Sequence, residues 1–195
     1  MPLNAILIRK THAGMSSTLG VTPYGGVIIN FEVIDLPGTG RLITTGNIAT
    51  SVKESAEVAL NYIIHNASEF GLDQKKIAAK NYHINSLCYA IKKSGSSGGL
   101  ALASAMTSLL LNKEIPVEVG FTGEIDLYGD ILKVGGIKEK IIGAYNNNFK
   151  KVFIPMENKN DLDTVPDSIK NQLEIICVDN FIDVYKELFK KSKKN

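Results

Sequence analysis

Two adjacent serines lie among glycines just ahead of a strongly apolar segment. Gly95-Ser96-Ser97-Gly98-Gly99 precedes residues 100–111, whose composition predicts a buried helix. The first turn of a helix presents unpaired N–H groups and a partial positive charge, and glycines let another group approach closely. Such a loop can bind a phosphate, stabilise the oxyanion of an intermediate formed on a serine, or only cap the helix. The Gly/Ser string alone does not show which of these roles it has, or which of the two serines would be a nucleophile.

A serine nucleophile needs a base, and the sequence offers two kinds. His83 is the nearest histidine, but it lies in a strand pattern with no partner carboxylate in sight, which favours a structural role. The other kind is a lysine that burial keeps neutral. In residues 137–144, Ile137, Ile141 and Ala144 form one helical stripe, and Lys138 and Lys140 flank it on either side. Helical periodicity does not decide which of the two lysines would be the base.

The composition excludes several classes of function. A net charge of +2 is too small to indicate binding to nucleic acid or to an anionic membrane. Cys88 and Cys177 fall in apolar runs typical of buried thiols, and together with the three histidines they show no metal-ligand spacing. Neither a signal peptide nor a spanning helix is predicted, so we expect a cytoplasmic protein that needs no metal.

The order of the expected elements predicts an α/β (α+β) fold with mixed sheets, some parallel pairing and a small C-terminal βα lobe. We expect a single domain over residues 1–195, with a lead-in at 1–14 and a disordered basic tail at 189–195. Expected strands cover residues 4–10, strands with glycine turns 17–46, a strand 81–91, two short strands 117–136, and strands 150–155 and 173–178. Expected helices cover 47–71, 100–111, 137–147 and 180–191, with a helical turn in the loop 158–166.

Several short motifs in order carry a family resemblance. "SGSSGGLALASAMTSLL", "TGEIDLYGDILKVGGIKEK" and "KKVFIPMENKNDL" resemble the proteolytic domain of Lon proteases, whose serine motif has the form GPSAG and whose lysine motif the form TGEI…VLPIGGLKEK. The resemblance extends from about Leu19 to Leu188. Because several independent motifs agree, it is more specific than the Gly/Ser string alone.

The resemblance implies roles for particular residues. The nucleophile falls on Ser97, because Ser96 occupies the family's proline position, and the catalytic lysine falls on Lys140. Thr122 matches the threonine that orients this lysine. Gly95, Ser96 and Gly98 belong to the loop whose backbone N–H groups stabilise the oxyanion.

The chain also departs from the family pattern. Ser94 stands where an acidic residue is usual, Ser96 replaces proline and Gly98 replaces alanine, which predicts a more flexible loop. Lys133 replaces the proline of the lysine motif. None of these changes removes the serine or the lysine.

The resemblance implies a serine endopeptidase that hydrolyses unfolded or damaged polypeptides with a Ser-Lys dyad. It further implies a hexameric ring, no cofactor in this chain, and an ATPase module or separate ATPase partner if ATP is used. One alternative is a non-catalytic Lon-like domain for assembly or partner binding. Another is a small-molecule kinase of the GHMP type, whose Gly/Ser loop holds phosphate, but it leaves the lysine motif unexplained.

Overall fold

The computed structural model describes residues 10–87 and 95–190. Its strands are β1 (Met15–Thr22), β2 (Gly25–Pro37), β3 (Leu42–Thr45), β4 (Lys80–Ser86), β5 (Val119–Phe121), β6 (Glu124–Ile125), β7 (Ile131–Leu132), β8 (Lys151–Pro155) and β9 (Glu174–Val178). Its α-helices are α1 (Thr50–His65), α2 (Gln74–Ala78), α3 (Gly99–Leu111), α4 (Ile137–Asn146), α5 (Asp167–Lys170) and α6 (Phe181–Tyr185). Shorter helical turns are η1 (Ala67–Phe70), η2 (Ser96–Gly98), η3 (Met156–Thr164) and η4 (Lys186–Lys190).

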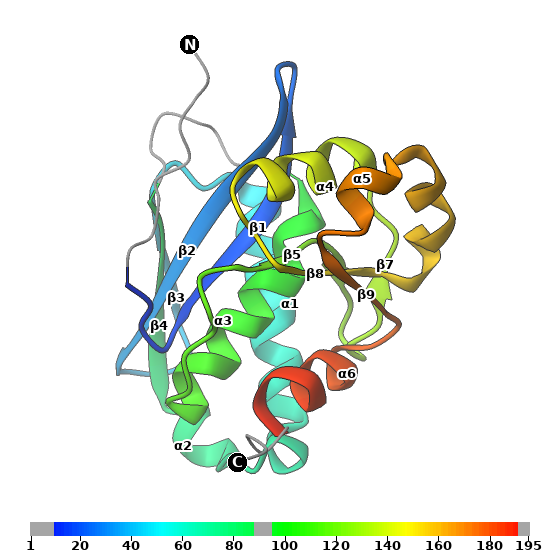
Figure 1. Cartoon of the computed structure of the whole chain (residues 1–195). Helices are drawn as coiled ribbons and strands as arrows, with labels where there is room; N and C mark the ends of the chain where they lie inside the picture. Colours follow the sequence, from blue (N-terminus) through cyan, green and yellow to red (C-terminus); the bar gives the residue numbers. More distant parts are fainter. Residues whose placement is uncertain (1–9, 88–94, 191–195) are drawn as a thin grey trace.

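A seven-stranded mixed sheet forms the centre, in the order β3-β4-β2-β1-β5-β8-β9 (Figure 1). The long β1–β2 hairpin is antiparallel, whereas β5, β8 and β9 run parallel to one another, as the alternation of strands and helices predicts. Strands β6 and β7 form a separate two-stranded hairpin. The expected α/β class with mixed sheets is therefore confirmed.

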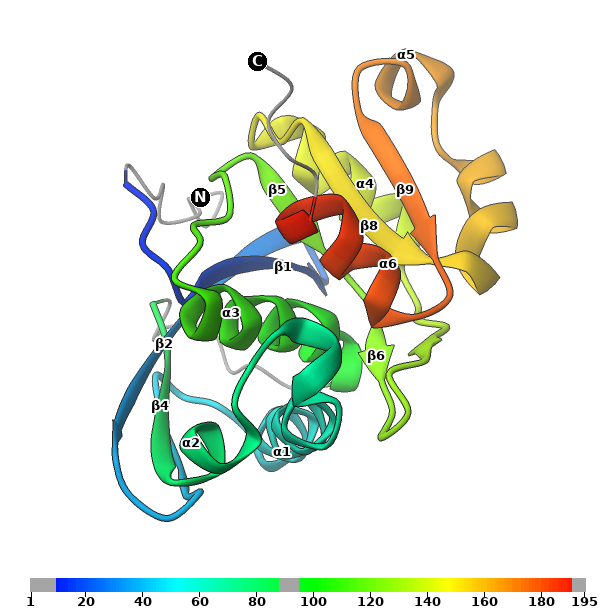
Figure 2. The ribbon, with the colours of Figure 1, turned by 90° about the horizontal axis from the view of Figure 1, so that it is seen from below.

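Helices α3 and α4 cover opposite faces of the β1–β2 hairpin, because alternate residues of a strand point to opposite faces. On the α3 side, Ser16 donates to the Ala101 carbonyl oxygen at 2.8 Å and Phe31 lies in the larger apolar core. On the α4 side, Leu19 packs with Ile137 and Ile141 in a second core. Figure 2 shows α1 and α3 together on one side of the sheet and α4 on the other.

The short β5 makes an opening between these two faces. It pairs with β1 only at Ser17 and Thr18, and it ends at Phe121. Strand β1 continues from Leu19 to Thr22, paired there with β2. Thr122 still donates its N–H to the Phe153 carbonyl oxygen of β8, and Gly123 then leaves the sheet, where its N–H donates to the Ser97 carbonyl oxygen at 3.0 Å. Residues from the two faces can therefore meet at the end of β5.

Tight contact between two glycines fixes α4 against the hairpin. A Cβ atom on Gly26 would lie 2.0 Å from the Glu139 carbonyl oxygen and 3.0 Å from the Cα of Gly143. The absence of side chains at Gly26 and Gly143 thus lets α4 approach the backbone of β2. Lys140 lies on this helix between the contacts at Glu139 and Gly143, so the glycine pair also fixes the distance of Lys140 from the sheet.

Several expected boundaries are wrong. The helix expected at 47–71 ends at His65, and a 3₁₀ turn follows because Phe70 turns inward to contact Tyr62 and Phe181 edge-on. The two strands expected at 117–136 are three. Phe189 and Lys190, which are expected in the basic tail, belong to η4, and Phe189 is buried. The strand expected at 4–10 lies almost entirely outside the described residues, as does Cys88, and Cys177 is only partly buried.

No helix in the described ranges is long and apolar enough to cross a lipid bilayer. Within residues 10–87 and 95–190, no group of three His, Cys, Asp or Glu side chains is arranged to hold a metal ion. His83 contacts Thr45 across β3 and β4, 3.0 Å from its hydroxyl oxygen, and it does not line the cavity described below.

Candidate active site

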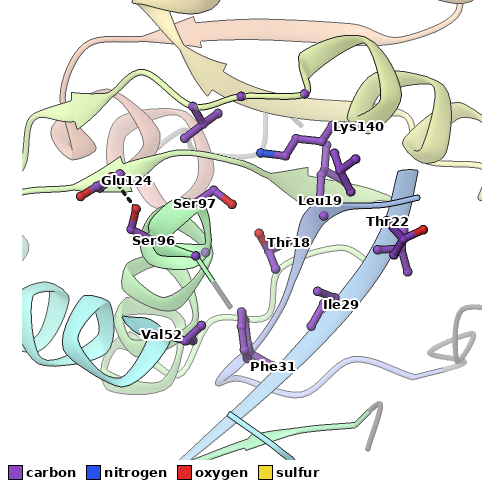
Figure 3. A pocket seen from close by; sticks show the side chains of 18 of the residues that line it. Thr18, Leu19, Thr22, Ile29, Phe31, Val52, Ser96, Ser97, Glu124 and Lys140 are labelled. Carbon is purple, nitrogen blue, oxygen red and sulfur yellow. Dashed lines mark hydrogen bonds between the residues drawn. The ribbon is translucent and has the colours of Figure 1, made fainter. Parts of the chain in front are cut away.

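A cavity of about 530 Å³ opens where α3, α4 and the β1–β2 hairpin meet. Its lining includes Gly95, Ser96, Ser97, Gly98 and Lys140, which are five of the six site residues expected from the sequence. Figure 3 shows Ser97 at the start of α3 on one side of the cavity, with Lys140 reaching in from α4 on the other. Thr122 completes the set through its contact with Lys140.

Lys140 is buried and has one side-chain partner among the described residues. Its side chain is 4% exposed, and Nζ donates a hydrogen bond of 3.0 Å to Thr122 Oγ1. Desolvation by burial lowers the pKa of Lys140 from 10.5 to about 8. Thr122 is fully buried at the carboxyl end of β5, where its N–H donates to the Phe153 carbonyl oxygen. The amine is thus held in place and is neutral in a large fraction of molecules near pH 8.

The structure distinguishes the two lysines that periodicity left open. Lys138 and Glu139 are exposed, whereas Lys140 is turned inward with the apolar stripe of α4. Strong desolvation is available only to a buried amine. Of the two lysines, Lys140 is therefore the one whose environment suits a base.

The loop that carries Ser97 is tethered at the two residues before it, Gly95 and Ser96. Ser96 Oγ donates a short hydrogen bond of 2.5 Å to Glu124 Oε2, and Gly95 N–H donates to Ser51 Oγ at 3.1 Å. Gly95 has a φ of 97°, a left-handed conformation that favours glycine. The expected gain in flexibility is therefore offset by these bonds. Gly95 N–H already has an acceptor, so it is a loop anchor in this conformation rather than a free oxyanion donor.

The substitution of glycine for alanine at position 98 changes little in the packing. Gly98 is buried, and a Cβ atom there would lie 3.5 Å from the ring of Phe31, an ordinary van der Waals distance. The site therefore has room for the alanine that is usual in this motif. By contrast, a Cβ on Gly99 would lie 3.0 Å from Ile125 Cγ2, so the next position is the tighter one.

Three contacts of the site were missed in the sequence analysis. Glu124 holds Ser96, Ser51 holds Gly95, and Thr18 lines the cavity while its hydroxyl donates to the Phe121 carbonyl oxygen at 3.2 Å. Glu124 lies two residues after Thr122 in the lysine motif, which is the signal that could have pointed to it. Ser51 and Thr18 lie in unremarkable sequence, and only the fold brings them to the loop.

Comparison with known proteins assigns the chain to a family. Residues 5–191 match the family model of the Lon protease (S16) C-terminal proteolytic domain. The chain belongs to this family. The match covers the serine motif, the lysine motif and the C-terminal lobe together, and the kinase alternative leaves the last two unexplained.

Lon proteases of several bacteria contain a stretch similar to this chain. The chain is 40% identical to the Lon protease of Malacoplasma penetrans over 177 residues, which is 91% of this chain and 23% of that protein. It is 37% identical to the Lon protease of aster yellows witches'-broom phytoplasma over 187 residues, 96% of this chain and 24% of that protein. The Lon protease of Mycoplasma pneumoniae is 38% identical over 176 residues. This Lon proteolytic domain thus spans about a quarter of the length of these relatives.

Proposed function

We propose that this chain is a serine endopeptidase in which Ser97 is the nucleophile and Lys140 the general base. The observation that carries the proposal is the buried, neutralisable amine of Lys140 on the same cavity as a serine at a helix N-terminus. A buried lysine beside an accessible serine hydroxyl is one of the known ways to activate a weak nucleophile. Membership of the Lon proteolytic family supports the same assignment.

In the proposed reaction, the proton of the Ser97 hydroxyl passes to Nζ of Lys140 as Oγ bonds to the carbonyl carbon of the substrate. The resulting oxyanion is stabilised by backbone N–H groups around Ser97, at the positive end of α3. Lys140 then gives its proton to the leaving amine as the C–N bond breaks. Water attacks the acyl-enzyme with Lys140 again as base, and the released proton restores the Ser97 hydroxyl.

The role of Thr122 in this scheme is to orient the amine. A neutral amine has one lone pair and two N–H bonds. When one N–H donates to Thr122 Oγ1, as it does in the structure, the lone pair is left to accept a proton. We therefore propose Thr122 as a positioning residue that keeps Lys140 from rotating away from Ser97.

The nature of the substrate and of the assembly is also part of the proposal. We propose that unfolded polypeptides are the substrates, that the domain works in a homo-oligomeric ring, and that any ATP is consumed by an ATPase module or partner rather than by this chain. The names of the relatives and the mixed polar and apolar lining of the cavity support a peptide substrate. No cofactor is needed for the chemistry described.

The pH dependence of peptide hydrolysis tests this function. Only neutral Lys140 can accept the serine proton, so we expect kcat/KM to rise with pH and level off above the pKa of about 8. About a tenth of the lysine is neutral one pH unit below its pKa, so the expected rise from pH 7 to pH 9 is about tenfold. The measurement is cleavage of a fluorogenic peptide between pH 6 and pH 10.

The other charged groups on the cavity define the control for this profile. Among the residues that the structure describes, Glu124 and Lys133 are the charged side chains that line it besides Lys140. Glu124→Gln and Lys133→Met should change the value of kcat/KM, but kcat/KM should still rise with pH near pH 8. A profile of the parent chain that is flat from mildly acidic to alkaline pH would exclude Lys140 as the base.

A further inference from the structure

Asn158 is fully buried in η3, just after β8, and its amide group is completely hydrogen-bonded. Its Oδ1 accepts from Val134 N–H at 3.0 Å, and its Nδ2 donates to the Val134 carbonyl oxygen at 2.8 Å. The second hydrogen of Nδ2 donates to Asp161 Oδ2 at 2.6 Å. Burying a primary amide is costly unless its groups are paired, so each of these bonds matters for the stability of the arrangement.

Asp161 fixes which way the amide faces. Both hydrogens of Nδ2 donate to oxygen atoms, one on Asp161 and one on Val134. The oxygen Oδ1 must then face the N–H of Val134. The side chain of Asn158 thereby pairs with both backbone groups of Val134, in the way that a neighbouring strand would.

Val134 belongs to the segment that joins β7 to α4 and forms one wall of the active-site cavity. Lys133, Val134, Gly135 and Gly136 all line this cavity, as does the loop that carries Ser97. Strand β7 pairs with β6 only as far as Leu132. In the described part of the chain, the backbone of Val134 is held by Asn158 rather than by a strand.

The same segment leads directly into the helix that carries the proposed base. Gly136 is the N-cap of α4 with a φ of 70°, and its carbonyl oxygen accepts from Lys140 N–H at 3.0 Å. The path from Asn158 to Lys140 therefore has few steps. Two hydrogen bonds fix Val134, the chain continues to Gly136, and the Gly136 carbonyl oxygen accepts the N–H of Lys140.

We propose that Asn158 is a positioning residue for catalysis, holding the cavity wall 133–136 and the start of α4 so that Lys140 reaches Ser97. Asn158 does not line the cavity and acts through Val134. This inference rests on the proposed Ser97–Lys140 chemistry. A displacement of about 1 Å in a reacting group can reduce a rate about 10²-fold, so a small movement of α4 is sufficient for a measurable effect.

The test is the kinetics of Asn158→Ala and Asn158→Asp in the 195-residue chain. We expect Asn158→Ala to lower kcat by about 10- to 100-fold with a smaller change in KM, because the misplaced group is a proton acceptor. Asn158→Asp keeps an acceptor for Val134 N–H but loses the donor and sets a second carboxylate beside Asp161, so its kcat should also fall. An unchanged kcat in Asn158→Ala would overturn the proposal.

A matched control lies at the other end of α4. Asn147 Nδ2 donates to the Gly143 carbonyl oxygen at 2.8 Å, so Asn147→Ala also removes a bond from an asparagine side chain to the backbone of this helix. It lies away from the cavity. We expect Asn147→Ala to lower thermal stability while kcat stays within about twofold, which separates a positioning effect from a loss of stability.

Amide hydrogen exchange gives a second measurement that does not depend on activity. Asn158→Ala should speed the exchange of peptides that cover residues 133–140 and leave those from β1 unchanged; unchanged exchange at 133–140 would overturn the proposal. If Asn158→Ala does not fold, Asp161→Ala carries the test, with a smaller expected fall in kcat of about threefold to tenfold. Cleavage that persists in Ser97→Ala would instead refute the proposed function, and the exchange result would then still decide whether Asn158 holds residues 133–140.

Discussion

Ser97→Ala is expected to lower kcat for peptide cleavage by about 10³-fold or more, because it removes the atom that bonds to the substrate carbonyl. Binding of the substrate should survive, since the cavity wall made by β1, β2 and the segment 133–136 is untouched by the change. The loop should also keep its conformation, because Ser96–Glu124 and Gly95–Ser51 hold it without the Ser97 side chain. The measurement is steady-state cleavage of casein and of a fluorogenic peptide.

Ser96→Ala is the matched control for this experiment. It removes a hydroxyl of the same kind one residue away, but that hydroxyl is bonded to Glu124. We expect kcat to fall by less than about tenfold, since only one tether of the loop is lost. If Ser96→Ala were the inactive variant and Ser97→Ala retained activity, the assignment of the nucleophile would be reversed. If neither change affected cleavage, the Gly/Ser loop would not be the catalytic loop.

Lys140→Met should abolish cleavage and at the same time stabilise the folded chain. Methionine fills a similar volume but has no proton acceptor, so we expect a loss of about 10³-fold in kcat. The lowered pKa means that the folded state disfavours the protonated amine, by roughly 3 kcal/mol for a shift from 10.5 to about 8. At pH 7 the amine is protonated in both the folded and unfolded states, so the parent chain carries this cost. Removing it should raise the melting temperature by several degrees.

The sign of this effect can be checked by pH. Between about pH 8 and pH 10.5 the unfolded chain binds a proton at Lys140 that the folded chain does not, so the stability of the parent chain should rise with pH in this window. The advantage of Lys140→Met should shrink accordingly. Lys138→Met is the control, because Lys138 is exposed on the same helix turn. It should leave both kcat and the melting temperature nearly unchanged, and a loss of activity there would contradict the choice of Lys140.

Local sequence patterns predicted the helices and strands that depend on periodicity. The apolar stripe of α4 and the alternation of strands β8 and β9 with helices were visible because burial repeats at a fixed spacing. The class of fold followed from the order of these elements. The end of α1 at His65 did not, because Phe70 is drawn inward by Tyr62 and by Phe181, and Phe181 is distant in sequence.

The site was predictable to a different extent. Helical periodicity reduced the candidate bases to Lys138 and Lys140, and the family resemblance chose between them; the burial of Lys140 agrees with that choice. Of the loop's partners, Glu124 has a signal in the lysine motif, whereas the contact of Ser51 with Gly95 is created only by tertiary packing, as is that of Asn158 with Val134. Asn158 stands in the loop 158–166, for which the sequence predicts a helical turn but no contact with Val134.

The rate at which Ser97 reacts with a serine-directed fluorophosphonate tests the central claim most directly, because it measures activation of the nucleophile without peptide cleavage. The account predicts an adduct on Ser97, located by peptide mass spectrometry, whose rate of formation rises with pH through about 8 and falls by about 10²-fold or more in Lys140→Met. An adduct on Ser96, or a rate on Ser97 that is unchanged in Lys140→Met, would contradict it.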